Sequence, residues 1–237
     1  MSADPSVPVP GRDSDAGDVA APFVPGRDWY AGDPGDVAAQ LLGAQLTTRR
    51  SDGEVTVRIT EVEVYRGRVD PASHAYRGPT ARNRAMFEEP GRLYVYRHLG
   101  LHHCVNVVTG PDGVASAVLL RAGEVVAGVD IARARRRAAG VTRTDVDLAR
   151  GPARLAVALG VDLTALRADL TDPDGDVVVR RDPSAPVPAH LTGPRVGVSG
   201  EGADPGRYPW RLWLAGEPTV SVYRPAAPSR RRTSRTV

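Results

Sequence analysis

The segment ITEVEVYRG, residues 59–67, continues a regular alternation of apolar and polar residues. Apolar side chains stand at every second position before it, with polar ones between them: Val55, Val57 and Ile59 against Glu54, Thr56 and Arg58. This period of two predicts a half-buried strand. The next odd-numbered positions, on the same predicted face, are Glu61, Glu63 and Tyr65. Two acids and a phenol thus stand where the pattern predicts apolar core residues.

Two interpretations of these acids are open. A β-bulge near Thr60 would shift the register, turn Val62 and Val64 toward the core and leave the acids in solvent. Alternatively, one carboxylate lies at the mouth of a pocket as a general base, because burial can raise the pKa of a glutamate for that role. Tyr65 would then lie beside that carboxylate on the same face.

The chain of 237 residues is 41% hydrophobic, which is enough for the core of one large domain or two small ones. It has no apolar run long enough to span a bilayer and no basic, then apolar, signal at its N-terminus. Cys104 is the single cysteine, so a disulfide framework and a Cys-rich zinc site within one chain are excluded. A reducing, cytoplasmic location is therefore expected.

The net charge of +3 is unevenly distributed. Residues 1–36 carry seven Asp and two Arg, residues 224–237 carry five Arg and no acid, and residues 66–100 carry seven Arg against three acids. The cluster in 66–100 is either a phosphate-binding surface or a solvated loop. All 31 basic residues are Arg, which excludes a lysine Schiff base and a phosphate-binding loop of the GK[ST] type.

Periodicity and turn residues predict the order of helices and strands. Asp33 caps a helix that starts at Pro34 and ends near Gly43. The other predicted elements are strands at 44–49, 54–65, 92–100, 102–110, 114–125 and 176–181, helices at 130–140 and 152–159, a strand or loop at 194–200, and a closing hairpin of 211–216 with 219–224. The Arg-rich loop of 66–91 has a length that is usually functional or disordered.

This pattern indicates the α+β class, with a single domain built on a curved, mostly antiparallel β-sheet and several flanking helices. Residues 28–225 would form that domain. Residues 1–27, rich in Pro, Gly, Asp, Ser and Ala, are expected to be a disordered leader, and residues 226–237 a basic flexible tail.

Aromatic residues are scarce, yet four tyrosines lie close together in the sequence: Tyr65, Tyr76, Tyr94 and Tyr96. Tyr94 and Tyr96 share one strand face, where they either pack as neighbours or form a stacking platform for a base. Possible metal ligands are also clustered: His98, His102, His103 and Cys104. Their spacing fits no zinc pattern, and no third group orients Cys104 as a nucleophile, so a small buried cysteine is expected.

Four motifs taken in order resemble the alkyladenine (3-methyladenine) DNA glycosylase family of base-excision repair: EVEVYRG, DPASHAYRG, TARNRAMFEEPGRLYVYRHLGLHHCVNVVT and AVLLRAGE. The stretches LLGAQL, GPARLAVALG and PRVGVSG resemble further blocks of that family. The order and spacing agree from about Tyr30 to Tyr223, which makes this a long composite pattern and a specific one. Residues 1–27 and 226–237 lie outside the resemblance.

The resemblance implies roles for particular residues of these motifs. Glu63 matches the family's catalytic base, and Arg121 matches an arginine near the catalytic water. Tyr65 and Tyr96 match the two walls of the base pocket. His74 matches the residue that packs on the flipped base and hydrogen-bonds to it.

Other matching positions imply contacts with the DNA. Asn106 matches the asparagine that opposes the 2-amino group of guanine. Leu99 matches the wedge that fills the gap in the duplex, where vertebrate members carry a Tyr. Leu can still insert between base steps, although it would stack less well. The expected contacts to the DNA backbone are Arg77, Arg82 and Arg84.

The resemblance therefore implies a monofunctional DNA glycosylase that flips an alkylated or deaminated purine out of duplex DNA. Hydrolysis of the N-glycosidic bond would leave an abasic site, and the absence of Lys argues against strand cleavage through a Schiff base. The expected protein is a cytoplasmic, nucleoid-associated monomer that needs no cofactor, metal or membrane. The alternatives are a non-catalytic DNA-damage binding module, against which Glu63 argues, and a small-molecule hydrolase, against which the Arg cluster and Leu99 argue.

Overall fold

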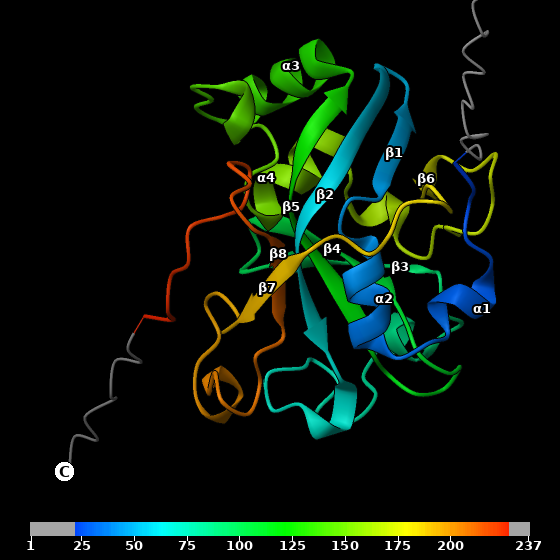
Figure 1. The fold of residues 1–237 in the computed structure, drawn as a ribbon, viewed down its shortest axis with the longest axis vertical. Helices are drawn as coiled ribbons and strands as arrows, with labels where there is room; N and C mark the ends of the chain where they lie inside the picture. The colour runs from blue at the N-terminus through cyan, green and yellow to red at the C-terminus, as the bar shows by residue number, and fades with distance from the viewer. Residues whose placement is uncertain (1–21, 228–237) are drawn as a thin grey trace, which may run out of the picture.

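The computed structural model describes residues 22–227 (Figure 1). Most of the predicted leader, 1–27, and of the predicted tail, 226–237, lies outside the described residues, so both stay predictions. Where the description begins, Phe23 forms a β-bridge with Arg181, and the first helix starts at Arg27. No helix within residues 22–227 combines the length and apolarity that crossing a bilayer requires.

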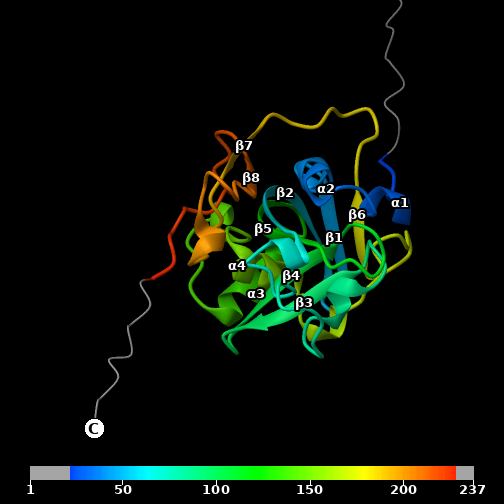
Figure 2. The ribbon, with the colours of Figure 1, turned by 90° about the horizontal axis from the view of Figure 1, so that it is seen from below.

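Eight strands within the described residues form one sheet, and all of their pairings are antiparallel. Six lie in the order β3-β4-β5-β2-β1-β6, while β8 pairs with β2 and β7 pairs with β8. The strands are β1 (Gln45–Arg50), β2 (Gly53–Tyr65), β3 (Leu93–His98), β4 (His102–Val108), β5 (Ala117–Ala127), β6 (Val177–Arg180), β7 (His190–Gly193) and β8 (Arg211–Leu214). In Figure 2 the strands follow a curve from β6 and β1 to β4 and β3, and the predicted α+β domain is confirmed.

The described α-helices are α1 (Arg27–Tyr30), α2 (Pro34–Leu41), α3 (Val129–Ala139) and α4 (Pro152–Leu159). The predicted cap of α2 is present, because the Asp33 carboxylate accepts a hydrogen bond from the backbone N–H of Gly35 at 2.8 Å. α4 ends at Gly160, whose φ of +65° suits a residue without a Cβ. Apolar residues of α2 and α4 share one core with β2 and β4.

β2 is the central strand of the sheet and has two partners on one edge. Its first half pairs with β1 and its second half with β8, while β5 pairs along most of its other edge. The register between β2 and β5 shifts at Thr60 on β2 and at Arg121 on β5. These irregularities form a bulge, and a bulge bends a strand and re-aims nearby side chains.

The predicted hairpin of 211–216 with 219–224 is wrong in its second strand. β8 pairs with β7 and β2 instead, and residues 219–224, which we call the C-terminal segment, form no strand. Ser221 donates its backbone N–H to the Glu61 carboxylate at 2.7 Å, and Arg211 donates to the Ser221 carbonyl at 2.8 Å. Side chains therefore satisfy backbone groups that a ladder would otherwise pair. Residues 194–200, predicted as strand or loop, are a loop.

Candidate active site

A cavity of about 450 Å³ opens between the β3–β4–β5 part of the sheet, the loop after β2, and residues 196–199. Five of the predicted site residues line it: Tyr65, His74, Tyr96, Asn106 and Arg121. The further lining residues that were not predicted as site residues include Met86, Leu119 and Val196. The alternation of VLLRA could have found Leu119, because it lies two residues before Arg121 on the same strand. Residues from distant motifs thus meet in one cavity.

The strand register explains why these residues meet. Tyr94 of β3 lies opposite Asn106 of β4. Asn106 in turn lies opposite Leu119 of β5, which lies opposite Glu63 of β2. Tyr96 follows Tyr94 on the same face, and their rings stack with centroids 5.5 Å apart. The sheet therefore carries a row of side chains from the tyrosine pair to the carboxylate.

The bulge in β2 decides between the two interpretations of Glu61 and Glu63. The register shift turns Val62 and Val64 into the apolar core, as the first interpretation predicts. The other half of that interpretation is wrong, because Glu61 and Glu63 have no solvent-exposed surface. β8, the C-terminal segment and the cavity wall supply their polar contacts, so both faces of β2 are buried at this point.

Glu63 lies directly behind the cavity wall. Its Oε2 accepts a hydrogen bond from the Tyr65 hydroxyl at 2.8 Å, and its Oε1 accepts one from the backbone N–H of Val196 at 2.7 Å. The Arg121 Nη1 lies 3.3 Å from Oε1. Tyr65, Val196 and Arg121 all line the cavity. Burial and the charge of Glu63 raise the pKa of Tyr65, so its hydroxyl keeps the proton that it donates.

Glu61 holds Arg121 from the side away from Glu63. Its Oε1 accepts from Arg121 Nε at 2.9 Å, from Arg211 Nε at 2.7 Å and from the Ser221 hydroxyl, while its Oε2 accepts from the Ser221 backbone N–H. Burial lowers the pKa of Arg121, but the charges of Glu63 and Glu61 raise it above its ordinary value. A permanent cation therefore lies at the cavity wall between two carboxylates.

His74 and Asn106 contact Tyr94 from two sides. The His74 Nδ1 lies 3.0 Å from the Tyr94 hydroxyl, and its ring meets the Tyr96 ring edge-on with centroids 4.5 Å apart. Burial and the nearby Arg82 lower the pKa of His74 from its ordinary value of 6.5, so the imidazole is neutral at pH 7. Asn106 donates its amide to the Tyr94 carbonyl at 2.9 Å.

Leu99 lies at the tip of the β3–β4 hairpin. Its side chain is 80% exposed and its φ is +50°, a backbone region that Gly and Asn adopt more readily than Leu. Leu101, also at the tip, is 71% exposed and was missed by sequence reasoning, although the pattern LGL shows both leucines. An apolar tip is therefore presented to solvent from two rigid strands.

The three arginines predicted to contact the DNA backbone are exposed between β2 and β3: Arg77, Arg82 and Arg84. The Arg82 guanidinium lies 5.9 Å from the Tyr96 ring centroid, which brings it to the cavity. Cys104 is buried and lines the cavity, and burial raises the pKa of its thiol. Among the described residues, no three His, Cys, Asp or Glu side chains are arranged to hold a metal ion.

Comparison with known proteins agrees with this geometry. The family model described as Methylpurine-DNA glycosylase matches residues 28–218. Three relatives carry the name "Putative 3-methyladenine DNA glycosylase". The Streptomyces avermitilis protein is 50% identical over 87% of this chain and 95% of its own length, the Leifsonia xyli protein 52% over 84% and 92%, and the Nocardia farcinica protein 52% over 83% and 91%.

The match confirms the resemblance that the motifs indicated, and with it the predicted activity class of a DNA glycosylase. It spans the helix α2, every strand of the sheet and all five predicted residues that line the cavity. The chain belongs to the methylpurine-DNA glycosylase family.

Proposed function

We propose that this protein flips an alkylated or deaminated purine out of duplex DNA and hydrolyses its N-glycosidic bond, leaving an abasic site. The observation that carries the proposal is a fully buried carboxylate, Glu63, that accepts two hydrogen bonds from residues lining an aromatic cavity and pairs with a third lining residue, Arg121. A base within a duplex is out of reach, so it must leave the stack before such a cavity can act on it.

The cavity supplies the binding energy for the extruded base. The rings of Tyr65 and Tyr96 line it, and base–aromatic stacking stabilises a bound base by about 1–3 kcal/mol per base. An N-alkylated purine carries a positive charge, which strengthens this stacking through cation–π attraction. The neutral His74 beside Tyr96 adds a polar edge without repelling a cationic base.

The chemical step uses Glu63 and a water molecule. The bond between C1′ and the base nitrogen breaks, its electron pair leaves with the base, and positive charge develops on the sugar as in glycoside hydrolysis. The Glu63 carboxylate stabilises that charge and accepts the proton of the water whose oxygen bonds to C1′. Arg121 Nη1, 3.3 Å from Glu63 Oε1, helps to orient the carboxylate.

The proposal includes the lesions that the enzyme excises and its oligomeric state. The substrate class is duplex DNA that contains 3-methyladenine, 7-methylguanine, hypoxanthine or ethenoadenine, and the enzyme acts as a monomer on nucleoid DNA. Because the chain has no Lys for a Schiff base, it releases the base and leaves the strand intact until alkali is added.

Glu63→Gln tests the proposal, because the amide keeps the shape of the side chain and removes the negative charge. We expect excision of 7-methylguanine from a duplex to fall by about 100-fold or more, with lesion affinity kept, since general-base catalysis contributes about 10²–10⁴-fold. Free base and alkali-labile sites report excision, and a gel shift reports affinity. Glu124→Gln, on an exposed glutamate, serves as the control.

Two results would contradict the proposal. Equal loss of excision and lesion affinity in Glu63→Gln would indicate misfolding rather than a lost base. A wild-type protein that binds lesion duplexes tightly but never releases a base would favour the alternative of a non-catalytic DNA-damage binding module.

A further inference from the structure

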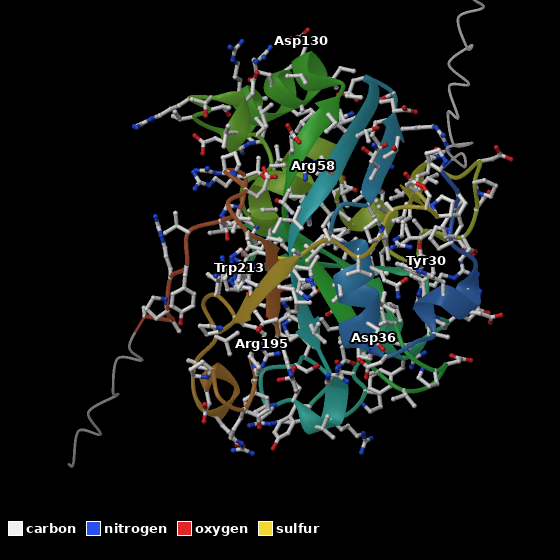
Figure 3. The ribbon with its side chains drawn as sticks, viewed as in Figure 1. Tyr30, Asp36, Arg58, Asp130, Arg195 and Trp213 are labelled. Atoms are coloured by element: carbon white, nitrogen blue, oxygen red, sulfur yellow. The ribbon has the colours of Figure 1, made fainter. Side chains whose placement is uncertain are left out.

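A buried ion pair lies behind the cavity, among residues that have no role in the proposed mechanism. Arg195 is 1% exposed and Asp70 is fully buried. The two Nη atoms of Arg195 donate to the two carboxylate oxygens of Asp70 at 2.6 and 2.7 Å. Figure 3 shows Arg195 near the second half of β2, the half that carries Glu63. The pair therefore lies close to the reacting carboxylate.

The ion pair joins three chain segments on one side of the cavity. Arg195 donates to the carbonyl of Val64 in β2 and to the carbonyl of Gly202, each at 3.0 Å. Asp70 accepts the backbone N–H of Ala72, a cavity-lining residue, at 3.0 Å. The end of β2, the loop after β2 and the loop of 194–203 are thus fixed to one another through two side chains.

Two of the three groups that hold the Glu63 carboxylate depend on Arg195. The Arg195 guanidinium lies 4.7 Å from the ring centroid of Tyr65, whose hydroxyl donates to Glu63. The residue after Arg195 is Val196, whose backbone N–H is the second donor. A cation on the ring also polarises the phenol and strengthens its O–H as a donor. Among residues 22–227, the third group that contacts Glu63 is Arg121, which does not touch this pair.

Stability alone does not explain the pair. Replacing a buried ion pair with apolar residues of similar size is often neutral or stabilising, because burial of two charges costs much of what their attraction returns. A guanidinium also offers what no apolar side chain does here, which is four hydrogen bonds together with stacking on an aromatic ring. The contacts of Arg195 reach Tyr65, which donates to the Glu63 carboxylate, and not only residues of the core.

We infer that Arg195 and Asp70 are positioning residues for the excision step: their ion pair fixes the Tyr65 hydroxyl and the Val196 N–H, which aim the Glu63 carboxylate at the sugar of the flipped nucleotide. The inference rests on the proposed function, since it assigns Glu63 to that step. Loss of the pair lowers the rate of bond cleavage and leaves the affinity for an extruded nucleotide almost unchanged. Misplacement of a reacting group by about 1 Å can cost about 100-fold in rate.

Two duplexes distinguish the orientation of the Glu63 carboxylate from the affinity of the protein for DNA. One contains a tetrahydrofuran abasic site, which is neutral. The other contains a protonated pyrrolidine ring in place of the deoxyribose, whose charge mimics the oxocarbenium ion. A well-aimed carboxylate makes the wild type bind the cationic duplex more tightly, as expected for a transition-state mimic. The ratio of the two dissociation constants therefore measures how well Glu63 faces the sugar.

The main variant is the double substitution Arg195→Met with Asp70→Asn, which removes both charges at nearly constant size. We expect its affinity for the tetrahydrofuran duplex to match the wild type. Most of its preference for the cationic duplex is expected to disappear, and its single-turnover excision rate to fall by about 100-fold. The matched control is Arg135→Met with Asp52→Asn, an ion pair between α3 and the β1–β2 turn. That control should keep both the preference and the rate.

Arg195→Lys keeps the test usable if the double variant does not fold. Lysine retains the charge but loses the bidentate fork and the stacking, so we expect a partial loss of both preference and rate at wild-type tetrahydrofuran affinity. Wild-type preference and rate in either folded Arg195 variant would overturn the inference. A wild type that neither excises 7-methylguanine nor prefers the cationic duplex would instead refute the proposed function itself.

Discussion

Two glutamates of one strand, Glu61 and Glu63, differ in what surrounds them. Both contact Arg121, which lines the cavity, but Glu63 also contacts the lining residues Tyr65 and Val196, whereas Glu61 also binds Arg211 and Ser221, which do not line it. The alternation of β2 placed both acids on one face, but it could not separate their roles. The partners that separate them come from far along the chain, with Ser221 160 residues after Glu61. Only the folded structure brings such partners together.

The surroundings of Glu61 give a pH-dependent prediction. Burial raises the pKa of Glu61, but Arg121 and Arg211 lower it more, so it lies below its ordinary value of 4.5. The unfolded chain has the ordinary value, so the stabilisation is full above pH 4.5 and is lost as the pH falls through the folded-state pKa. We expect Glu61→Gln to lower the free energy of unfolding by about 3–5 kcal/mol at pH 7. Urea unfolding at pH 7 and in the acid range measures the difference.

The control for this prediction is Glu124→Gln. Glu124 pairs with Arg58 at the surface and is 48% exposed, so its loss should change the free energy of unfolding by less than about 1 kcal/mol. A Glu61→Gln deficit that stays constant from pH 7 into the acid range would show that the lost charge is not its cause.

The β3–β4 hairpin carries the proposed wedge. Its strands are fixed in the sheet, while its tip presents Leu99 and Leu101 to solvent. Neither burial nor backbone preference accounts for a leucine with φ of +50° at this position. A backbone outlier of this kind is expected where function selects the side chain.

Leu99→Ala removes most of the apolar bulk of the proposed wedge. Filling the gap in the stack offsets the cost of unstacking, so we expect excision from duplex DNA to slow by about tenfold, the effect of losing about 1–2 kcal/mol of apolar burial. Excision from a single-stranded oligonucleotide should not change, because no gap has to be filled there. Val141→Ala, at another 80% exposed position, is the control. Equal slowing on both substrates would refute the wedge.

The sequence predicted elements well where periodicity alone defines them. The helix capped by Asp33, the two strands around the turn at 51–53, and the β3–β4 pair all appear where expected. Prediction was wrong at 219–224, where the alternation of TVSVYR suggested a strand. There the carboxylate of Glu61 competes for the backbone of Ser221, and local periodicity carries no information about a distant acceptor.

The order of the sheet also lay beyond the sequence. The first half of β2 pairs with β1, and its second half pairs with β8. β8 comes from near the C-terminal end of the described residues. That arrangement places the loop of 194–203 over Glu63 and so completes the cavity wall. The motifs named five residues that line the cavity, whereas the connection between the loop and β2 required three-dimensional contacts such as that of Arg195 with Val64.

Charge is distributed unequally over the folded molecule. Two of the four arginines of α3 lie beside acids, since Arg133 pairs with Asp145 and Arg135 with Asp52. The segment of 66–100, by contrast, carries seven Arg against three acids and borders the cavity. Figure 1 shows α3 at the opposite end of β2 from the loop that follows that strand. A segment with a surplus of positive charge thus lies on the side of the molecule where the DNA is expected.

Salt dependence of DNA binding tests this placement. Each arginine that neutralises a phosphate contributes about 0.9 to the slope of log affinity against log salt concentration, because counterions are released. We therefore expect Arg77→Ala and Arg84→Ala each to reduce the slope by about 0.9, measured by fluorescence anisotropy on an undamaged duplex over a range of salt concentrations. Arg137→Ala removes an equally exposed arginine from α3 and should leave the slope unchanged. An equal reduction of the slope by all three substitutions would contradict binding of the DNA on the cavity side. Nonspecific attraction to the net charge of the protein would then explain the binding.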